Sequence, residues 1–261
     1  MPKLHVRDID LYYEMTGQGQ PLLLIHGLGD SSRSWEKQVP FFSKQYQVVT
    51  FDVRGHGQSD KPPGPYSIPL FAEDTAEVIK SLRIAPAHVV GISMGGMIAF
   101  QLAATVPDFL KSMVIINSGP AMLVRTFKER WEIFKRLALV RILGMRAIGK
   151  VLSQRIFPRP EHETLRKIFV ERWAENDKRA YLDSTRALVN WSVAKHLGGI
   201  RCPTLVIASD GDYTPVSAKE AYVAKMPHAE LAVMSDSHHG VHLEWPEKFN
   251  EILMTFLSKQ A

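Results

Sequence analysis

The pentapeptide Gly-Ile-Ser-Met-Gly at residues 91–95 constrains this chain more than any other feature. An apolar stretch at residues 88–90 precedes it, and residues 96–103 continue with the composition of a helix. This setting predicts a strand, a sharp turn and a helix. A serine in such a turn is held clear of the backbone, as a nucleophilic hydroxyl must be to meet a base. On its own, the pentapeptide also fits an ordinary glycine-rich connection.

Two further turns place an acid and a histidine after predicted strands. The apolar stretch 202–209 leads into Asp210 and Asp212, and the stretch 229–234 leads into His238 and His239. With Ser93, the chain order is serine, aspartate, histidine, each just past the end of a strand, which is the order of one type of catalytic triad. Either aspartate and either histidine could serve on this evidence.

A fourth turn supplies groups that could stabilise negative charge. The apolar residues 21–25 end in His-Gly-Leu-Gly at residues 26–29, an open turn from which a backbone N–H can point at a developing anion. We predict that the N–H groups of Leu28 and Met94 form an oxyanion hole, because Met94 follows the serine and begins a helix. The alternative is a turn that merely ends a strand.

Composition indicates a globular chain with one large core. Of its 261 residues, 45% are hydrophobic and 23% are charged, an ordinary balance for such a protein. No apolar run approaches the ~20 residues that span a bilayer, and charges interrupt the N-terminal segment. We therefore expect a cytoplasmic protein without a membrane partner. The single cysteine, Cys202, excludes an internal disulfide.

The order of the predicted elements indicates a layered α/β fold. Strand patterns alternate with helical patterns, which predicts a mostly parallel eight-stranded sheet with helices on both faces and an antiparallel hairpin at one edge. Between residues 119 and 199 the strand pattern disappears and helical patterns replace it. We expect residues 1–118 and 200–261 to form the core domain and residues 119–199 a helical insertion.

Positive charge is concentrated in this insertion. Residues 120–196 contain 17 lysines and arginines against 8 aspartates and glutamates, a net charge of +9. Solvated helix faces explain this count, but Arg125 or Arg130 could instead hold a substrate carboxylate. Nucleic acid is not an expected partner, because no matching motif or stripe of aromatic and basic residues accompanies the charge.

Taken together, these motifs resemble the α/β-hydrolase family, which includes small carboxylesterases, enol-lactone hydrolases and carbon–carbon bond hydrolases. Residues 52–59 resemble the family's D-x-R-G-x-G-x-S turn, and the resemblance extends over residues 11–257. It implies Ser93 as nucleophile, Asp212 as acid by the register of the turn after its strand, and His239 as base by its spacing from Pro246 and Glu247. Serine at position 93 is unlike the relatives that form an alkyl-enzyme ester on aspartate.

The resemblance also implies a reaction. We expect a serine hydrolase that cleaves a carboxylic ester or (enol-)lactone through an acyl-enzyme, needs no cofactor or metal, and has a helical cap over its active site. The expected partner is the small-molecule substrate, and a homodimer is possible. Two alternatives stay open: a carbon–carbon bond hydrolase of ring-cleavage products, and a slow-turnover small-molecule receptor of the same fold.

Overall fold

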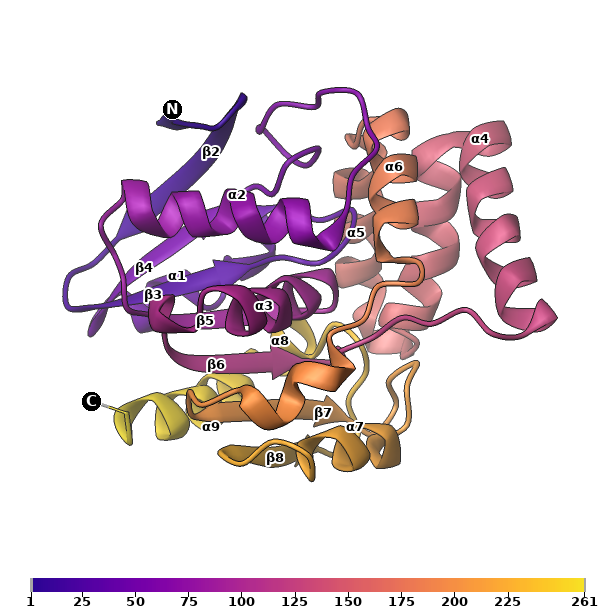
Figure 1. Cartoon of the computed structure of the whole chain (residues 1–261). Helices are drawn as coiled ribbons and strands as arrows, with labels where there is room; N and C mark the ends of the chain where they lie inside the picture. Colours follow the sequence, from indigo (N-terminus) through magenta and orange to yellow (C-terminus); the bar gives the residue numbers. More distant parts are fainter. Residues whose placement is uncertain (1, 261) are drawn as a thin grey trace.

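The computed structural model describes residues 2–260, and its centre is one eight-stranded sheet (Figure 1). The strand order is β1-β2-β4-β3-β5-β6-β7-β8. β1 and β2 pair antiparallel at one edge, β2 is antiparallel to β4, and all other neighbours are parallel. The strands are β1 Lys3–Val6, β2 Ile9–Thr16, β3 Gln20–Ile25, β4 Tyr46–Phe51, β5 Ala87–Ile92, β6 Leu110–Ile116, β7 Thr204–Ser209 and β8 Ala229–Met234. The predicted mostly parallel sheet with an antiparallel edge is confirmed.

Helices cover both faces of the sheet, so its central strands are apolar on both sides. Successive side chains of β3 point to opposite faces: Leu22 and Leu24 pack in one hydrophobic cluster, and Leu23 and Ile25 pack in the other. The first cluster includes residues of α1 and α9, and the second includes residues of α2, α3 and α7. The helices are α1 Val39–Phe42, α2 Ile68–Ser81, α3 Met94–Thr105, α7 Val216–Val223, α8 Val241–Glu244 and α9 Pro246–Ser258.

The chain between β6 and β7 is helical and has a hydrophobic cluster of its own. It contains α4 Phe127–Ile156, α5 Glu163–Ala174 and α6 Lys178–Leu188. Val140, Trp173 and Tyr181 are members of its cluster. Helices α4, α5 and α6 stand together beyond the ends of the central strands (Figure 1), and we call this segment the cap. The domain boundaries near residues 118 and 200 stay a prediction.

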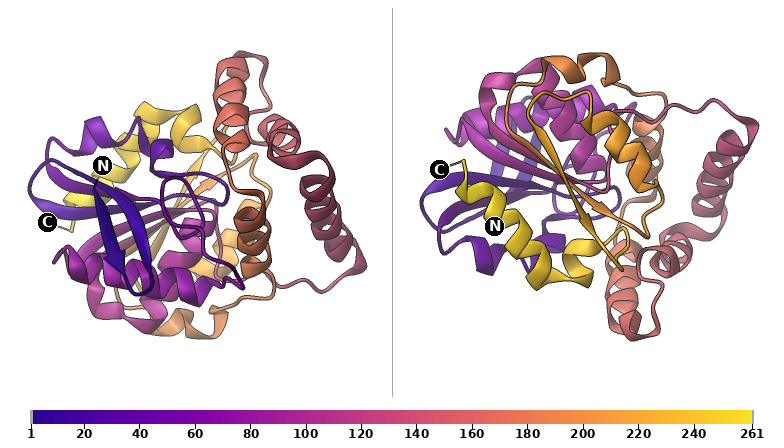
Figure 2. Two further views of the ribbon diagram at one scale, coloured as in Figure 1. Left: turned by 90° about the horizontal axis from the view of Figure 1, so that it is seen from above. Right: turned by 90° about the horizontal axis from the view of Figure 1, so that it is seen from below.

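The long helix α4 begins with a capping box and changes direction in the middle. The Thr126 side chain accepts from the Glu129 N–H, and the Glu129 carboxylate accepts from the Thr126 N–H. Gly144 interrupts the helix with φ of 79° and ψ of −174°. The half of α4 before Gly144 lies at the outer rim of the cap (Figure 2). Within residues 2–260, no helix combines the length and the apolar run that crossing a membrane requires.

Candidate active site

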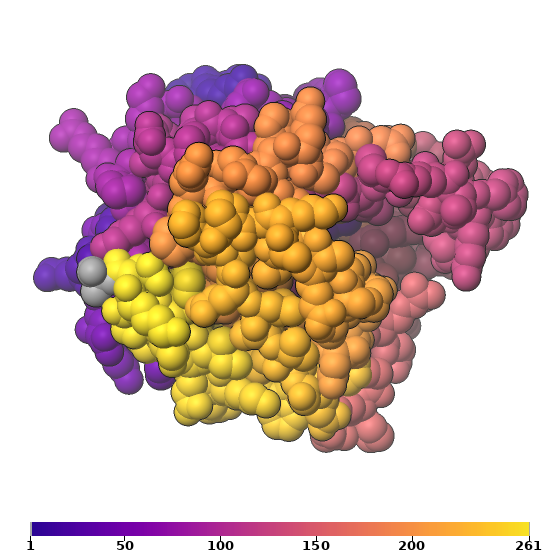
Figure 3. Space-filling view, turned by 60° about the horizontal axis from the view of Figure 1, so that its bottom comes forward, coloured from indigo at the N-terminus to yellow at the C-terminus, as the bar shows by residue number. Residues whose placement is uncertain are grey.

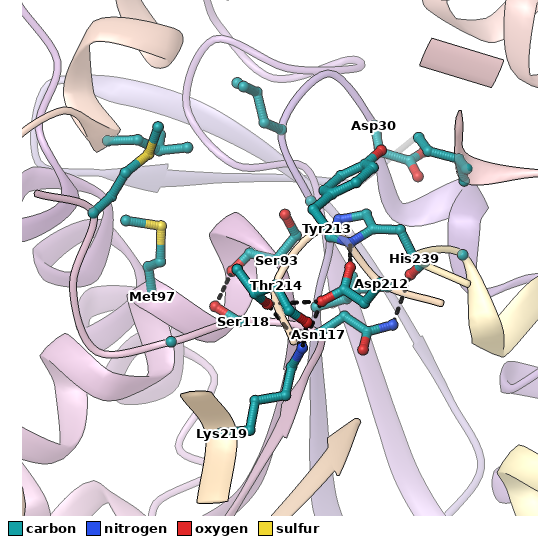
Figure 4. A pocket seen from close by; sticks show the side chains of 18 of the residues that line it. Asp30, Ser93, Met97, Asn117, Ser118, Asp212, Tyr213, Thr214, Lys219 and His239 are labelled. Carbon is teal, nitrogen blue, oxygen red and sulfur yellow. Dashed lines mark hydrogen bonds and ion pairs between the residues drawn. The ribbon is translucent and has the colours of Figure 1, made fainter. Parts of the chain in front are cut away.

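Ser93 occupies the turn between β5 and α3 in a strained backbone conformation, with φ of 53° and ψ of −115°. Such a conformation costs about 1–3 kcal/mol at a residue other than glycine. The turn requires Gly91 and Gly95: a Cβ on Gly91 would lie 2.2 Å from the Gly95 carbonyl oxygen, and one on Gly95 would lie 2.2 Å from that of Ile25. The strain presents Ser93 at the wall of a cavity at the carboxyl edge of the sheet (Figure 4).

Asp212 and His239 line the same cavity from the loops that follow β7 and β8. Because these strands are neighbours, their loops lie side by side, and His239 Nδ1 is 2.6 Å from Asp212 Oδ1. A carboxylate only accepts hydrogen bonds, so Nδ1 carries the proton and Nε2 is left as an acceptor. The ring of Tyr213 stacks on the imidazole, with centroids 4.4 Å apart, and fixes its plane. The structure thus brings Ser93, Asp212 and His239 together.

Asp212 is ionised by its surroundings although its side chain is only 1% exposed. Burial by itself would raise the pKa of this carboxyl, but hydrogen bonds and charge from His239 and Lys219 outweigh burial and hold the pKa well below its usual value of 3.8. Lys219 Nζ donates to Asp212 Oδ2 at 2.6 Å, and also to the carbonyl and hydroxyl oxygens of Thr214. Asp212 is therefore a fixed negative charge.

Lys219 is a site residue that sequence reasoning missed. It lies on α7, seven residues after Asp212, and its side chain is only 1% exposed. A lysine on a short helix normally faces solvent, and no motif marks this one. Its side chain points inward because α7 packs beside β7 and β8, and this packing cannot be read from the sequence.

The competing aspartate and histidine have other partners. The Asp210 carboxylate accepts from the N–H groups of Asp236 and Ser237, at 3.0 and 3.2 Å. His238 Nδ1 is 2.8 Å from a carboxylate oxygen of Glu244, and the His238 N–H donates to the other oxygen at 2.6 Å. Neither Asp210 nor His238 lines the cavity within the described chain. Both hold loops in place.

Asn117 connects the end of β6 to the histidine loop and was also missed. Its Nδ2 donates to the backbone oxygens of His238 and His239, at 3.1 Å each, and to Ser209 Oγ at 2.9 Å. Its Oδ1 accepts from the Ser209 N–H at 2.9 Å. The sequence did contain a signal that could have identified Asn117 as a site residue, because an asparagine directly follows an apolar strand at the functional edge of the sheet. Asn117 fixes the position of the loop that carries His239.

The two predicted oxyanion donors lie on either side of the serine turn. Met94 is the first residue of α3, where a backbone N–H has no acceptor inside the helix. Leu28 lines the cavity, and among the described residues no backbone acceptor takes its N–H. A Cβ on the preceding Gly27 would lie 3.5 Å from Ser93 Cβ, so this turn touches the serine turn.

The cavity between core and cap has a volume of about 610 Å³ and mostly apolar walls. Ile92 and Met97 come from the core, and Leu152, Phe157 and Trp173 come from the cap. Figure 3 shows a recess between the loops of the core and the cap. A cavity of this size, with mostly apolar walls and several polar groups among them, suits a small organic molecule.

The cap arginines differ in whether they reach the cavity. Arg125 and Arg130 are exposed, and within residues 2–260 neither lines the cavity. Arg136 does line it, with Nε and Nη2 2.8 and 2.5 Å from the hydroxyl oxygen of buried Tyr181. No carboxylate within the described residues pairs with Arg136. The start of α4 faces outward, and Arg136 lies on its inner side.

Comparisons with known proteins agree with this architecture. A family model described as alpha/beta hydrolase fold matches residues 20–139. The putative carbamate hydrolase RutD of Azorhizobium caulinodans is 31% identical, over 98% of each chain. The (E)-2-((N-methylformamido)methylene)succinate hydrolase of Acinetobacter baylyi is 31% identical, over 94% of this chain and 93% of its own. The structure of the enol-lactonase from Burkholderia xenovorans LB400 superposes with a TM-score of 0.91 at 26% identity, covering 98% of this chain and 100% of the other.

Proposed function

This chain belongs to the α/β-hydrolase family and is a hydrolase, and from that premise we propose that it cleaves a carboxylic ester or lactone through an acyl-enzyme on Ser93. The observation that carries the proposal is the geometry around His239. Its Nδ1 is fixed by Asp212 at 2.6 Å, and its other nitrogen, which has no hydrogen-bond partner within residues 2–260, can act on a serine that lines the same cavity.

In the first half of the reaction, His239 Nε2 takes the proton from Ser93 Oγ as that oxygen attacks the substrate carbonyl carbon. The tetrahedral intermediate then collapses: the bond from carbon to the leaving oxygen breaks, and His239 gives its proton to that oxygen. Asp212 keeps the imidazole in the required tautomer and stabilises its protonated form. The product of this half is an ester of Ser93.

In the second half, a water molecule takes the place of the departed alcohol. His239 removes one proton from the water as its oxygen attacks the acyl carbon, and the same proton returns to Ser93 Oγ when the acid leaves. In both halves the N–H groups of Leu28 and Met94 bind the oxyanion, contributing about 3 kcal/mol per donor. The residues supply all of the proton transfers.

For the substrate, we propose a small ester or lactone that carries an acidic group besides the scissile bond. Arg136 is a half-buried guanidinium in a mostly apolar cavity, and a carboxylate would give it the charged partner that it lacks within residues 2–260. In this proposal Arg136 binds the substrate carboxylate, a role for which the sequence had offered Arg125 or Arg130 as an alternative to solvated helix faces. The succinate in the name of the Acinetobacter baylyi relative supports an acidic substrate.

A carbamate is the second candidate substrate, because the Azorhizobium caulinodans relative at 31% identity is named a putative carbamate hydrolase. The same serine, histidine and oxyanion donors can act on a carbamate carbonyl, which differs from an ester in having a nitrogen on the acyl side.

The test combines turnover with covalent labelling. We expect the protein to hydrolyse p-nitrophenyl esters or lactones with many turnovers, and Ser93→Ala to abolish both hydrolysis and labelling by a fluorophosphonate. Ser81→Ala, an exposed serine of α2, is the matched control and should keep both. Labelling that persists in folded Ser93→Ala contradicts the proposal.

The substrate panel separates the alternatives. Turnover of carbamates with little action on esters favours the second candidate, and turnover of ring-cleavage dienes favours carbon–carbon bond hydrolysis. One labelling event without steady-state turnover on any of these substrates indicates a receptor of the same fold.

A further inference from the structure

An apolar stripe runs along the outward side of the first half of α4. Phe127, Trp131, Phe134 and Ile142 follow one another at intervals of four, three and eight residues, which places them on one face of a helix. All four are exposed, Phe127 by 81% and Ile142 by 79%. The rings of Trp131 and Phe134 stack in solvent, with centroids 5.2 Å apart. We call these four residues the outer stripe.

The outer stripe is not a part of the cap's core. The opposite side of the same helix forms the cap's core instead: Val140 is fully buried, and Leu137 packs against the hydrophobic cluster of the cap. Arg136, also on the inner side, reaches Tyr181 and the cavity. Half of α4 thus has two apolar faces, and the fold covers only one. Large exposed apolar surfaces of this kind mark interaction sites.

Basic side chains flank the outer stripe on both sides. At 100° per residue, Lys128 and Lys135 fall on one side of it, and Arg130 and Arg141 fall on the other. Lys135 pairs with Glu132 at 2.6 Å, whereas the other three form no ion pair within residues 2–260. The outer stripe itself has no acidic residue. The missing occupant is therefore apolar at its centre and negatively charged at its edges.

A second copy of this chain does not have that chemistry. A two-fold axis through the outer stripe would bring Lys128, Arg130 and Arg141 near the same three residues of the other copy, and like charges would repel. An anionic lipid surface does have it. Aromatic and aliphatic side chains enter the boundary of the acyl chains, while the long basic side chains reach back to the phosphates.

We propose that the outer stripe docks this protein on the surface of an anionic lipid membrane, with α4 lying in the plane of the interface. The expectation of no membrane partner came from the lack of a spanning segment, which does not bear on a helix that lies in the interface. Docking would hold the roof of the active-site cavity against the lipid, since Arg136 is on the other side of the same helix. The proposal does not depend on the reaction catalysed.

The test is co-sedimentation of the full-length chain with vesicles. We expect binding to vesicles of equal parts phosphatidylcholine and phosphatidylglycerol, weaker binding to pure phosphatidylcholine, and a blue shift of Trp131 fluorescence on the anionic vesicles. The triple variant Phe127→Ser, Trp131→Ser, Phe134→Ser should lose binding. The triple variant Lys128→Glu, Arg130→Glu, Arg141→Glu should bind about 100-fold more weakly or worse, because each basic residue near the surface contributes a factor of about five.

The matched control makes the same change in net charge on the core: Lys37→Glu, Lys44→Glu, Lys248→Glu, all exposed and remote from α4 in sequence. The control should bind anionic vesicles nearly as well as the unchanged protein, and all variants should keep the circular dichroism spectrum and Tm of the unchanged protein, which shows that they fold. Three results overturn the proposal. The first is that the unchanged protein does not bind anionic vesicles, and the second is that the control variant binds them as weakly as the Lys128→Glu, Arg130→Glu, Arg141→Glu variant. The third is a doubled mass in sedimentation equilibrium that the triple variant Phe127→Ser, Trp131→Ser, Phe134→Ser abolishes.

Discussion

Removing either member of the buried pair between Asp212 and Lys219 should destabilise the protein, and removing both should not. Each side chain is 1% exposed, and their charged atoms are 2.6 Å apart. Asp212→Asn leaves an ammonium group in the interior, and Lys219→Met leaves a carboxylate there, so each change should cost about 3–5 kcal/mol. For a domain of this size, that lowers Tm by about 10 °C.

The double variant Asp212→Asn, Lys219→Met buries no unpaired charge. Its free energy of unfolding should therefore return to within about 2 kcal/mol of the original, because replacing a buried pair as a whole is often nearly neutral. Activity should follow a different pattern. Asp212→Asn and the double variant should both lose about 10⁴-fold in kcat, since His239 is no longer held in the required tautomer. Lys219→Met should lose far less.

The pH dependence of the free energy of unfolding gives a further test of the pair. The folded-state pKa of Asp212 is depressed, so its ionisation contributes stability that is present above the unfolded value of 3.8 and is lost as the pH falls below it. The free energy of unfolding of the original protein, relative to that of the double variant, should therefore fall below about pH 4.

Urea unfolding at several pH values measures the stability of each variant, and kcat on a soluble p-nitrophenyl ester measures its activity. Two results would refute the reasoning: a double variant as unstable as the sum of the single changes, or one that regains activity together with stability. The first would mean that the pair does not act as a unit. The second would mean that Asp212 serves only to compensate Lys219.

Other predictions test the remaining assignments. His239→Ala should lower kcat by several orders of magnitude in steady-state assays, whereas His238→Ala should mainly lower Tm through loss of its bond to Glu244. Arg136→Met should lower kcat/KM about tenfold or more for esters that bear a free carboxylate, and should change kcat/KM little for their methyl-capped analogues. Arg130→Met is the control and should change neither value. Equal effects of Arg136→Met on both substrates would contradict a carboxylate partner. Burial lowers the pKa of His242 from 6.5 to about 3, so the unfolded chain takes up a proton first and stability falls as the pH drops below 6.5. His242→Phe should remove about 2 kcal/mol of that loss at pH 5 in urea unfolding, and an unchanged pH slope would count against a neutral buried imidazole.

The sequence by itself determined the fold and the main residues of the candidate site. Both depend on short-range patterns: a serine between two glycines must lie in a tight turn, and residues at the ends of parallel strands must meet at one edge of the sheet. For this reason Ser93, Asp212 and His239 could be named together before any distance was known. The choice between neighbouring aspartates and histidines relied on the family register, and the structure gives Asp210 and His238 other hydrogen-bond partners.

The tertiary structure alone decided which way the other side chains face. Lys219 and Arg136 resemble any surface lysine or arginine in the sequence, and only the packing of α7 and α4 turns them inward. The outer stripe of α4 looks like a second buried face in the sequence, because helical spacing shows that residues share a side but not what lies against it. For Arg125 and Arg130 the sequence left two readings, a solvated helix face and a contact with substrate, and in the structure both side chains lie in solvent. The direction of a side chain depends on contacts between segments far apart in the chain, and local spacing carries no information about those contacts.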